Sequence, residues 1–337
     1  MDKRGQILVI LTGGTICSAT NAEGHRYSSA KTVKILDAFQ KSRSPYRETV
    51  DFVTQMPMDI LSENMTVAGW NCLLDTLRAA DLSQYQGVIV LHGTDTLAYT
   101  AALLSISLAG IPIPLVMVSS QLPLGHKATN GHHNFRSAVE LIMNGIAPNV
   151  YAVYRNSDGI TYVHQGAHLL SCPDYSDDFY SRDPMVIGDT ENACLDGIPF
   201  ETDRLYLHAI SPLSPCVLQV NPYVGLDYDA LRLDGVQAVV HSTYHSQTVC
   251  VEEDSSSILD LLKRCKEQSI PLILAPCSKD AFQYVSTGKA LAQGAFCVWG
   301  LTREMAYVKT LVGCAIGLTG EKLQTFLNTP INHEVNL

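Results

Sequence analysis

The sequence predicts an α/β protein with two domains, of which the larger, N-terminal one is built on a doubly wound, mostly parallel sheet and the smaller, C-terminal one is also α/β. Short apolar runs end at small polar residues, as fully buried parallel strands do. Helical patterns alternate with these runs, which is typical of doubly wound sheets. A chain of 337 residues is long enough for about two domains. We expect the domains at residues 1–190 and 213–337, joined by a linker at 191–212.

Four apolar runs are the predicted strands of the N-terminal sheet: Gln6 to Leu11, Gly87 to Leu91, Pro114 to Val118 and Val150 to Tyr154. Between them, helices are expected at Thr66 to Leu77, Ala98 to Leu108 and Ala138 to Met143. In the first helix Trp70, Leu73, Leu74 and Leu77 share one face, and Thr66 can cap its N-terminus. Ligands of such sheets bind beyond the carboxyl ends of the strands. The polar segments that follow the runs are therefore the expected location of a site.

The pattern weakens between Asp158 and Ile210, where we expect hairpins. A second α/β region follows, and the tail beyond Pro330 is expected to be loosely held. The predicted strands of this region are Ala238 to Val240, Pro271 to Ala275 and Ala295 to Trp299. Its predicted helices are Ser256 to Gln268, Gly288 to Ala292 and Thr302 to Leu311.

Composition and charge exclude several classes of function. Asp and Glu outnumber Lys and Arg by 33 to 23, and a net charge of −10 argues against binding to nucleic acid. No apolar segment approaches the ~18 residues of a membrane span, and the run near the N-terminus is too short for a signal peptide. The ten cysteines lack C-x-x-C spacing and the histidines lack metal-ligand spacing. We therefore expect a cytoplasmic protein with reduced thiols, surface histidines, no metal, and neither nucleic acid nor membrane as a partner.

The most informative residues follow the first two predicted strands. One run ends in Thr12-Gly13-Gly14-Thr15, and another in His92-Gly93-Thr94-Asp95-Thr96. Paired glycines allow a sharp turn and close approach to a ligand, a threonine hydroxyl can act as a nucleophile, and a carboxylate can hold a substrate ammonium. Each segment alone also fits a strand-to-helix turn with a capping residue. If both strands lie near the switch point of the sheet, the two segments meet in one cleft.

Three further segments fit the same cleft. Ser62-Glu63 precedes the first helix, and Ser120-Gln121 follows the run that ends at Val118. These residues can bind a small polar ligand, although they are also ordinary loop composition. The segment from Cys17 to Ser29 is either a lid that brings Tyr27 over Thr12 or a mobile surface loop.

Together these segments resemble the bacterial L-asparaginase family, in particular its cytoplasmic type I branch. The resemblance rests on Thr12 to Ile16 and His92 to Thr96, which look like the two signatures of the family. Ser62 to Thr66 resembles its substrate-binding serine segment, and Thr302 to Lys309 resembles a family helix. The resemblance implies a hydrolase that converts L-asparagine and water to L-aspartate and ammonia without metal or cofactor. It also implies a homodimer or homotetramer.

The resemblance also implies roles for individual residues. Thr12 would be the nucleophile, Thr94 would assist proton transfer, Asp95 would bind the substrate ammonium, and Tyr27 would close over Thr12. Backbone N–H groups near Gly13 and Thr94 would stabilise the oxyanion. The implied substrate-binding residues are Gly13, Thr15, Ser62, Glu63, Gly93, Ser120 and Gln121.

One position departs from the family pattern. The family places a lysine near what is here Leu169 or Leu170, and this chain has no lysine between Lys127 and Lys263. His164 and His168 are the nearest candidates to replace it, because a neutral imidazole can accept the threonine proton; the alternative is two surface histidines on a hairpin. The departure leaves two other functions open. One is hydrolysis of a different amide, such as glutamine or D-asparagine, and the other is amino-acid binding without turnover.

Overall fold

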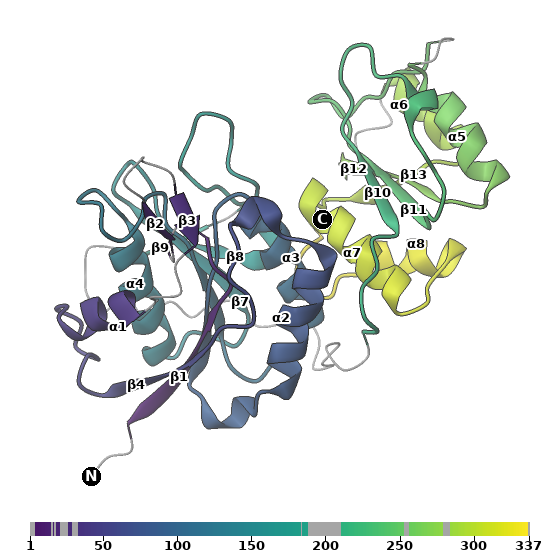
Figure 1. Cartoon of the computed structure of the whole chain (residues 1–337). Coiled ribbons are helices and arrows are strands. Elements are labelled where there is room, and N and C mark those ends of the chain that lie inside the picture. The colour runs from purple at the N-terminus through teal and green to yellow at the C-terminus, as the bar shows by residue number, and fades with distance from the viewer. Residues whose placement is uncertain are drawn as a thin grey trace. The chain divides into compact units, whose positions relative to one another are not determined.

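The computed structural model describes residues 4–14, 16, 18–20, 26–28, 33–182, 184–187, 210–252, 256–278 and 284–335. The chain divides into two compact units, Met1–Ala209 and Ile210–Leu337, and each unit has its own parallel or mostly parallel sheet (Figure 1). The predicted fold class is therefore confirmed, with the larger sheet in the N-terminal unit. Most of the predicted linker, at residues 191–212, lies outside the described residues.

The first sheet has the strand order β4-β1-β5-β6-β7-β8-β9. Neighbouring strands are parallel from β4 to β7, and β8 and β9 add an antiparallel edge. Leu11, Leu91 and Val118 are register partners across β1, β5 and β6, so the segments that follow these three strands leave the sheet at one level. The strands are β1 Gly5–Leu11, β4 Val50–Gln55, β5 Gly87–Leu91, β6 Leu115–Val118, β7 Val150–Arg155, β8 Thr161–Gln165 and β9 Met185–Ile187.

Helices cover both faces of this sheet. Figure 1 shows α1 (Val33–Gln40) and α4 (Gly131–Met143) on one side, and α2 (Val67–Ala79) and α3 (Leu97–Ser107) on the other. Every α3 residue except Tyr99 is buried, as expected for a helix that is apolar on all sides. In α2 the predicted apolar face is the buried one, and the predicted cap is confirmed: the Thr66 side chain accepts a hydrogen bond from the Gly69 N–H. A small hairpin, β2 Ser18–Thr20 and β3 Arg26–Ser28, stands apart from the main sheet.

The second unit repeats the architecture on a smaller scale. Four parallel strands have the order β10-β11-β12-β13. They are β10 Val217–Val220, β11 Ala238–His241, β12 Leu272–Cys277 and β13 Phe296–Trp299. The helices are α5 Ile258–Glu267, α6 Val285–Ala292, α7 Arg303–Ala315 and α8 Gly320–Asn328. None of the helices in the part of the chain that the structure describes is long and apolar enough to cross a membrane.

The tail beyond Pro330 is not loose, which corrects the prediction. Glu334 and Asn332 are buried, and Glu334 accepts hydrogen bonds from the backbone N–H groups of Ile331 and Asn332. Its carboxylate also meets the buried ammonium of Lys309 in α7, with Nζ and Oε1 2.5 Å apart. A buried charge needs a partner, and this pair supplies one to each group. Lys309 and Glu334 are 25 residues apart, so the sequence alone did not indicate that they pair.

Candidate active site

Three segments meet at the carboxyl edge of the first sheet: Thr12 to Gly14 after β1, Ile60 to Ser62 before α2, and His92 to Asp95 after β5. Backbone hydrogen bonds join the first two, from Ile60 N to Thr12 O at 3.1 Å and from Gly14 N to Ile60 O at 2.7 Å. The third segment packs against both, because a Cβ added to Gly93 would lie 2.4 Å from the Ser62 hydroxyl and 3.2 Å from the Gly14 Cα. The predicted convergence of the two threonine segments is thus present in the structure.

Two glycines make this contact possible. Gly13 has φ +107° and Gly14 has φ +79°, a region that L side chains rarely adopt. A Cβ on Gly13 would lie 2.1 Å from the Ile60 carbonyl oxygen, and one on Gly14 would lie 2.4 Å from the backbone of Gly93. Any side chain at either position would separate the segments that carry the candidate catalytic groups.

Thr12 is held at the end of β1 and is only 2% exposed. Its backbone N–H and its hydroxyl both donate to the Leu91 carbonyl, at 3.1 and 3.0 Å. The neighbouring strand therefore fixes the hydroxyl oxygen in place. Since the hydroxyl donates its proton, the lone pairs of that oxygen are left for other contacts.

Asp95 and Ser62 form a second fixed pair. The Ser62 hydroxyl donates to Oδ2 of Asp95 at 2.7 Å and accepts from the Asp95 N–H at 3.2 Å. Thr96 ties the same two segments together, since its hydroxyl donates to the Ser62 carbonyl at 2.9 Å. Asp95 is nonetheless exposed, so its carboxylate is positioned by the protein while it remains open to a ligand. A fixed, accessible carboxylate is suited to a cationic group.

Thr94, between Gly93 and Asp95, is half-buried. Among the described residues, neither its backbone N–H nor its hydroxyl has a hydrogen-bond partner. Such groups at the end of a buried strand are available to a substrate or a water molecule. The described residues contain no cluster of three His, Cys, Asp or Glu side chains that could hold a metal ion.

His92 lies directly beneath this loop and is fully buried, contrary to the prediction of surface histidines. Its Nδ1 is 2.8 Å from the Gly93 carbonyl oxygen, and its Nε2 is 3.0 Å from the Thr100 hydroxyl in α3. Burial lowers the pKa of His92 to about 4, so the ring is neutral near pH 7. No role was assigned to His92 from the sequence. The one indication in the sequence is that this polar residue directly follows the fully apolar run of β5.

The chain is similar in sequence to known asparaginases. The family model "Asparaginase, N-terminal" matches residues 6–170. The L-asparaginase of Thermococcus kodakarensis is 29% identical over 69% of this chain and 71% of its own length. L-asparaginase 1 of Escherichia coli K12 is 26% identical over 87% of this chain and 86% of its own. The chain is a member of the asparaginase family.

Solved structures show the same fold in asparaginases. The thermostable L-asparaginase from T. kodakarensis superposes with a TM-score of 0.80 at 20% identity and covers 98% of this chain and 99% of its own. L-asparaginase I from Vibrio cholerae superposes with a TM-score of 0.76 at 21% identity. That match covers 99% of this chain and 100% of the V. cholerae chain. A second kind of relative is a glutamyl-tRNA(Gln) amidotransferase component from Metallosphaera sedula, 30% identical over 49% of this chain and 37% of that protein. The chain is thus an asparaginase-family amidohydrolase whose amide substrate is not fixed by similarity alone.

The two histidines considered as replacements for the asparaginase lysine are buried, and the alternative of surface histidines is wrong. His164 in β8 is inaccessible to solvent, and its Nδ1 is 2.7 Å from the Ser181 hydroxyl. Burial lowers its pKa to about 4. His168 ends a short 3-10 helix, Gly166–His168, and is 8% exposed.

The chain segment that follows these histidines approaches the site. Leu170, at or next to the lysine position, is 41% exposed, and its N–H donates to Tyr180 O at 3.0 Å. Farther along, burial together with the nearby carboxylates of Asp177, Asp178 and Asp95 raises the pKa of the Cys172 thiol to about 11. Cys172 thus lies within electrostatic range of Asp95, and among the described residues no hydrogen bond or ion pair brings an ammonium to Asp95.

The remaining predicted residues have different positions. Ser120 is buried just beyond β6, but its hydroxyl contacts Thr129 and the Leu122 carbonyl within its own loop. Gln121 is half-buried in that loop, and Glu63 is exposed beside Ser62. Thr15 lies outside the described residues. Tyr27 belongs to β3, where its backbone pairs with Ala19, and its side chain lies outside the described part.

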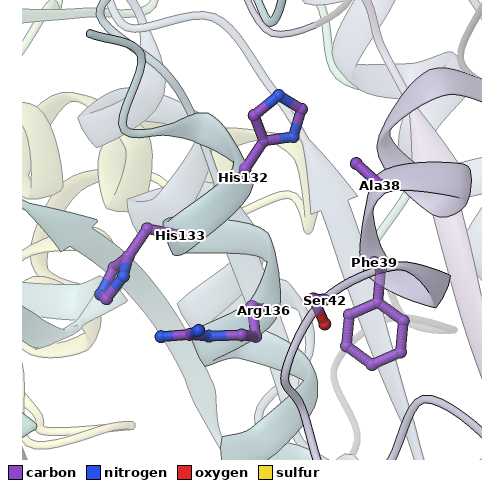
Figure 2. Close-up of a pocket in the computed structure, with 6 residues that line it drawn as sticks. All are labelled: Ala38, Phe39, Ser42, His132, His133 and Arg136. Atoms are coloured by element: carbon purple, nitrogen blue, oxygen red, sulfur yellow. The ribbon is translucent and has the colours of Figure 1, made fainter. Parts of the chain in front are cut away.

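A cavity of about 180 Å³ between α1 and α4 contains none of the predicted site residues (Figure 2). Its polar side chains from α4 already have partners: His132 Nε2 is 3.0 Å from Leu124 O, and His133 Nε2 is 2.7 Å from the Thr161 hydroxyl. Arg136 forms an ion pair with Glu140 at 3.7 Å. The cavity is lined by Ala38, Phe39, Ser42, His132, His133 and Arg136.

Proposed function

We propose that this protein hydrolyses L-asparagine to L-aspartate and ammonia, with Thr12 as the nucleophile. The observation that carries the proposal is the junction of three segments at one sheet edge. It brings the fixed Thr12 hydroxyl, the open Thr94 and the fixed Asp95–Ser62 pair to the carboxyl ends of adjacent strands. Membership of the asparaginase family supports the reaction class.

In this proposal the Thr12 oxygen attacks the side-chain amide carbon of asparagine and gives up its proton. The C–N bond then breaks, and ammonia leaves with the proton that the amide nitrogen needs. An aspartyl ester on Thr12 remains, and water cleaves it to release aspartate and restore the hydroxyl. Thr94 orients the water or passes the proton.

Substrate binding follows from the same geometry. The Asp95 carboxylate, fixed by Ser62, binds the α-ammonium of the substrate through a charge-assisted hydrogen bond. Ser62 and nearby backbone N–H groups bind its α-carboxylate. The N–H groups of Gly13 and Thr94 face the amide oxygen and stabilise the negative charge that develops on it, which is usually the largest single contribution to catalysis.

The attack by Thr12 also needs a group that accepts its proton. His168 and His164, both buried, are the candidates nearest to the lysine position, and burial lowers the pKa of His164, which keeps its imidazole neutral and able to accept a proton. We expect a His168→Ala or a His164→Ala variant to lose turnover by about 100-fold if its imidazole is the base. Unchanged rate and pH profile in both variants would remove both from the mechanism.

A different amide substrate is the second candidate, because relatives of this chain include an amidotransferase component as well as asparaginases. Ammonia release should therefore be measured on L-asparagine, L-glutamine and D-asparagine with the same purified protein. The proposal predicts the highest kcat/KM on L-asparagine. A higher value on either other amide would transfer the function to that substrate.

The test of the nucleophile uses a Thr12→Ala variant and a matched Thr325→Ala control. Thr325 is exposed on α8 in the other unit, so its loss leaves the site intact. We expect Thr12→Ala to lose turnover by about three orders of magnitude or more, and the control to keep it. Binding of asparagine without turnover by the wild-type protein, measured by calorimetry, would instead indicate an amino-acid-binding relative.

A further inference from the structure

A chain of buried hydrogen bonds runs from the core of the first unit to the candidate active-site loop. The Trp70 indole N–H of α2 donates to the Thr100 hydroxyl of α3 at 3.0 Å. That hydroxyl is 3.0 Å from His92 Nε2, and His92 Nδ1 is 2.8 Å from the Gly93 carbonyl oxygen. Trp70 is 6% exposed, and Thr100 and His92 are inaccessible to solvent.

The donor and the acceptor of each hydrogen bond in this series follow from the chemistry of the groups. A carbonyl oxygen only accepts, so Nδ1 of the neutral His92 ring carries the proton and Nε2 is an acceptor. Thr100 must therefore donate its hydroxyl proton to Nε2, which leaves its oxygen to accept from Trp70. All donors point the same way, and the chain ends on the Gly93 carbonyl.

The Gly93 carbonyl and the Thr94 N–H belong to one peptide unit, and in a trans peptide they point in opposite directions. Because the carbonyl faces His92 in the core, the N–H faces away from the core. It has no acceptor among the described residues, and it stands beside Asp95 and the Gly14 turn. The series of hydrogen bonds thus fixes the orientation of the free Thr94 N–H at the site.

We propose that Trp70, Thr100 and His92 are positioning residues that orient and polarise the Gly93–Thr94 peptide, so that the Thr94 N–H binds the developing oxyanion more strongly. Hydrogen bonds in series polarise one another, and a donor on a peptide carbonyl strengthens the N–H of that peptide as a donor. A preoriented donor needs no reorganisation during the reaction. This inference rests on the proposed amidohydrolase function.

Thr100 is the best position for a test because it contacts no substrate and can be replaced without a change of volume. Thr100→Val removes the hydroxyl from the middle of the chain, and Thr100→Ser keeps it. We expect Thr100→Val to lower kcat by about tenfold with KM within about twofold of wild type, since removing an entire oxyanion donor costs about 10²–10³ in kcat. Thr100→Ser should restore kcat to within about twofold. Wild-type kcat in Thr100→Val, or equal losses in both variants, would overturn the inference.

A spectroscopic measurement separates this inference from the proposed function. The Gly–Thr dipeptide occurs twice in the chain, at Gly14–Thr15 and Gly93–Thr94. Labelling glycine carbonyls with ¹³C and threonine nitrogens with ¹⁵N therefore gives two peptide signals, and the one absent from a Thr94→Ser variant belongs to Gly93–Thr94. Thr100→Val should shift that signal upfield in its carbonyl and amide-proton dimensions and leave the other unchanged.

The two readouts fail independently. A wild-type protein without amidase activity would overturn the proposed function, while the peptide signal would still report the hydrogen-bond chain. An unshifted Gly93–Thr94 signal would contradict the inference that these hydrogen bonds polarise the peptide, even if the enzyme is active. If Thr100→Val does not fold by circular dichroism, Trp70→Phe takes its place. It removes only the first donor, and we expect it to move the same signal and lower kcat by a smaller factor.

Discussion

The carboxyl edges of the two parallel sheets have similar composition but differ in how their polar groups are used. At the edge of the second sheet these groups are bonded to one another. The Ser242 hydroxyl donates to Oδ1 of Asn221 at 2.6 Å, and the Thr243 hydroxyl donates to the Pro276 carbonyl at 2.8 Å. At the edge of the first sheet, Thr94 has no hydrogen-bond partner for its hydroxyl or N–H among the described residues.

A buried histidine at each edge sharpens the comparison. His92 and His241 are both inaccessible to solvent, burial lowers the pKa of each to about 4, and each bonds a hydroxyl through Nε2. The hydroxyl belongs to Thr100 in the first unit and to Tyr228 in the second. His92 Nδ1 in addition lies 2.8 Å from the carbonyl oxygen of the Gly93–Thr94 peptide, whereas among the described residues His241 Nδ1 has no partner within normal hydrogen-bond geometry. The two edges thus show that the capacity to bind a ligand depends on which polar groups lack a partner in the protein, and residue type alone does not reveal this.

The largest difference between the two units is expected for Asp95 and an exposed aspartate of the second unit, Asp227. Asp95 is fixed by Ser62 in the site, whereas Asp227 caps a 3-10 helix in the second unit, where its side chain accepts from the Asp229 N–H. We expect Asp95→Ala to lower kcat/KM on L-asparagine by about 100-fold, because it removes a charge-assisted contact to the substrate. Asp227→Ala should stay within about twofold. Equal losses in the two variants would contradict the assignment of the site.

Two serines give a matched pair of smaller changes. Ser62 and Ser242 each donate to a side-chain oxygen, at 2.7 and 2.6 Å. Ser62→Ala should lower kcat/KM by about tenfold, because it frees Asp95 to rotate. Ser242→Ala should leave kcat/KM unchanged and lower the free energy of unfolding by about 1 kcal/mol. Steady-state kinetics and urea denaturation of both variants measure these effects, and the reverse pattern would overturn the comparison.

The last expected effect is on the free energy of unfolding as a function of pH, and it involves histidines of both units. The pKa of His92, His164 and His241 is lowered from 6.5 to about 4 by burial. The unfolded chain therefore binds more protons than the folded one between these values. The free energy of unfolding should be highest above pH 6.5 and fall as the pH drops toward 4, by at most about 1.4 kcal/mol per pH unit for each histidine.

Urea denaturation at several pH values between 7 and 4.5 measures this slope, with His164→Asn and His241→Asn as comparisons. Each variant should lose part of the pH dependence. A wild-type free energy of unfolding that stays flat across this range would show that these histidines titrate normally in the folded protein.

Much of the fold could be predicted because buried parallel strands leave a local signature. Uninterrupted apolar runs identified β1, β5, β6 and β7, and the glycines that follow β1 predicted a turn of the observed kind. The edge strand β4 was not predicted, because its apolar residues are interrupted by polar ones and most of the strand is only partly buried or exposed. The strength of the apolar signal therefore follows the depth of each strand in the sheet.

The contacts that define the site could be predicted only in part. Thr12 and Asp95 stand out since polar residues directly follow buried runs. The bonds of His92 to Thr100 and of Lys309 to Glu334 depend on which elements pack together, and sequence spacing carries no information on that. Thr12, Thr94 and Ser62 are thus placed by local sequence, while the residues that hold them are placed by tertiary structure.

The most direct test of the central claim is to locate the covalent intermediate. Wild-type protein would be quenched with acid during turnover of L-asparagine, digested, and analysed by peptide mass spectrometry, with Thr12→Ala treated in the same way. We expect an aspartyl ester on Thr12 in the wild-type protein and none at that position in the variant. An ester mapped to another residue, or a Thr12→Ala variant that turns over asparagine at the wild-type rate, would contradict it.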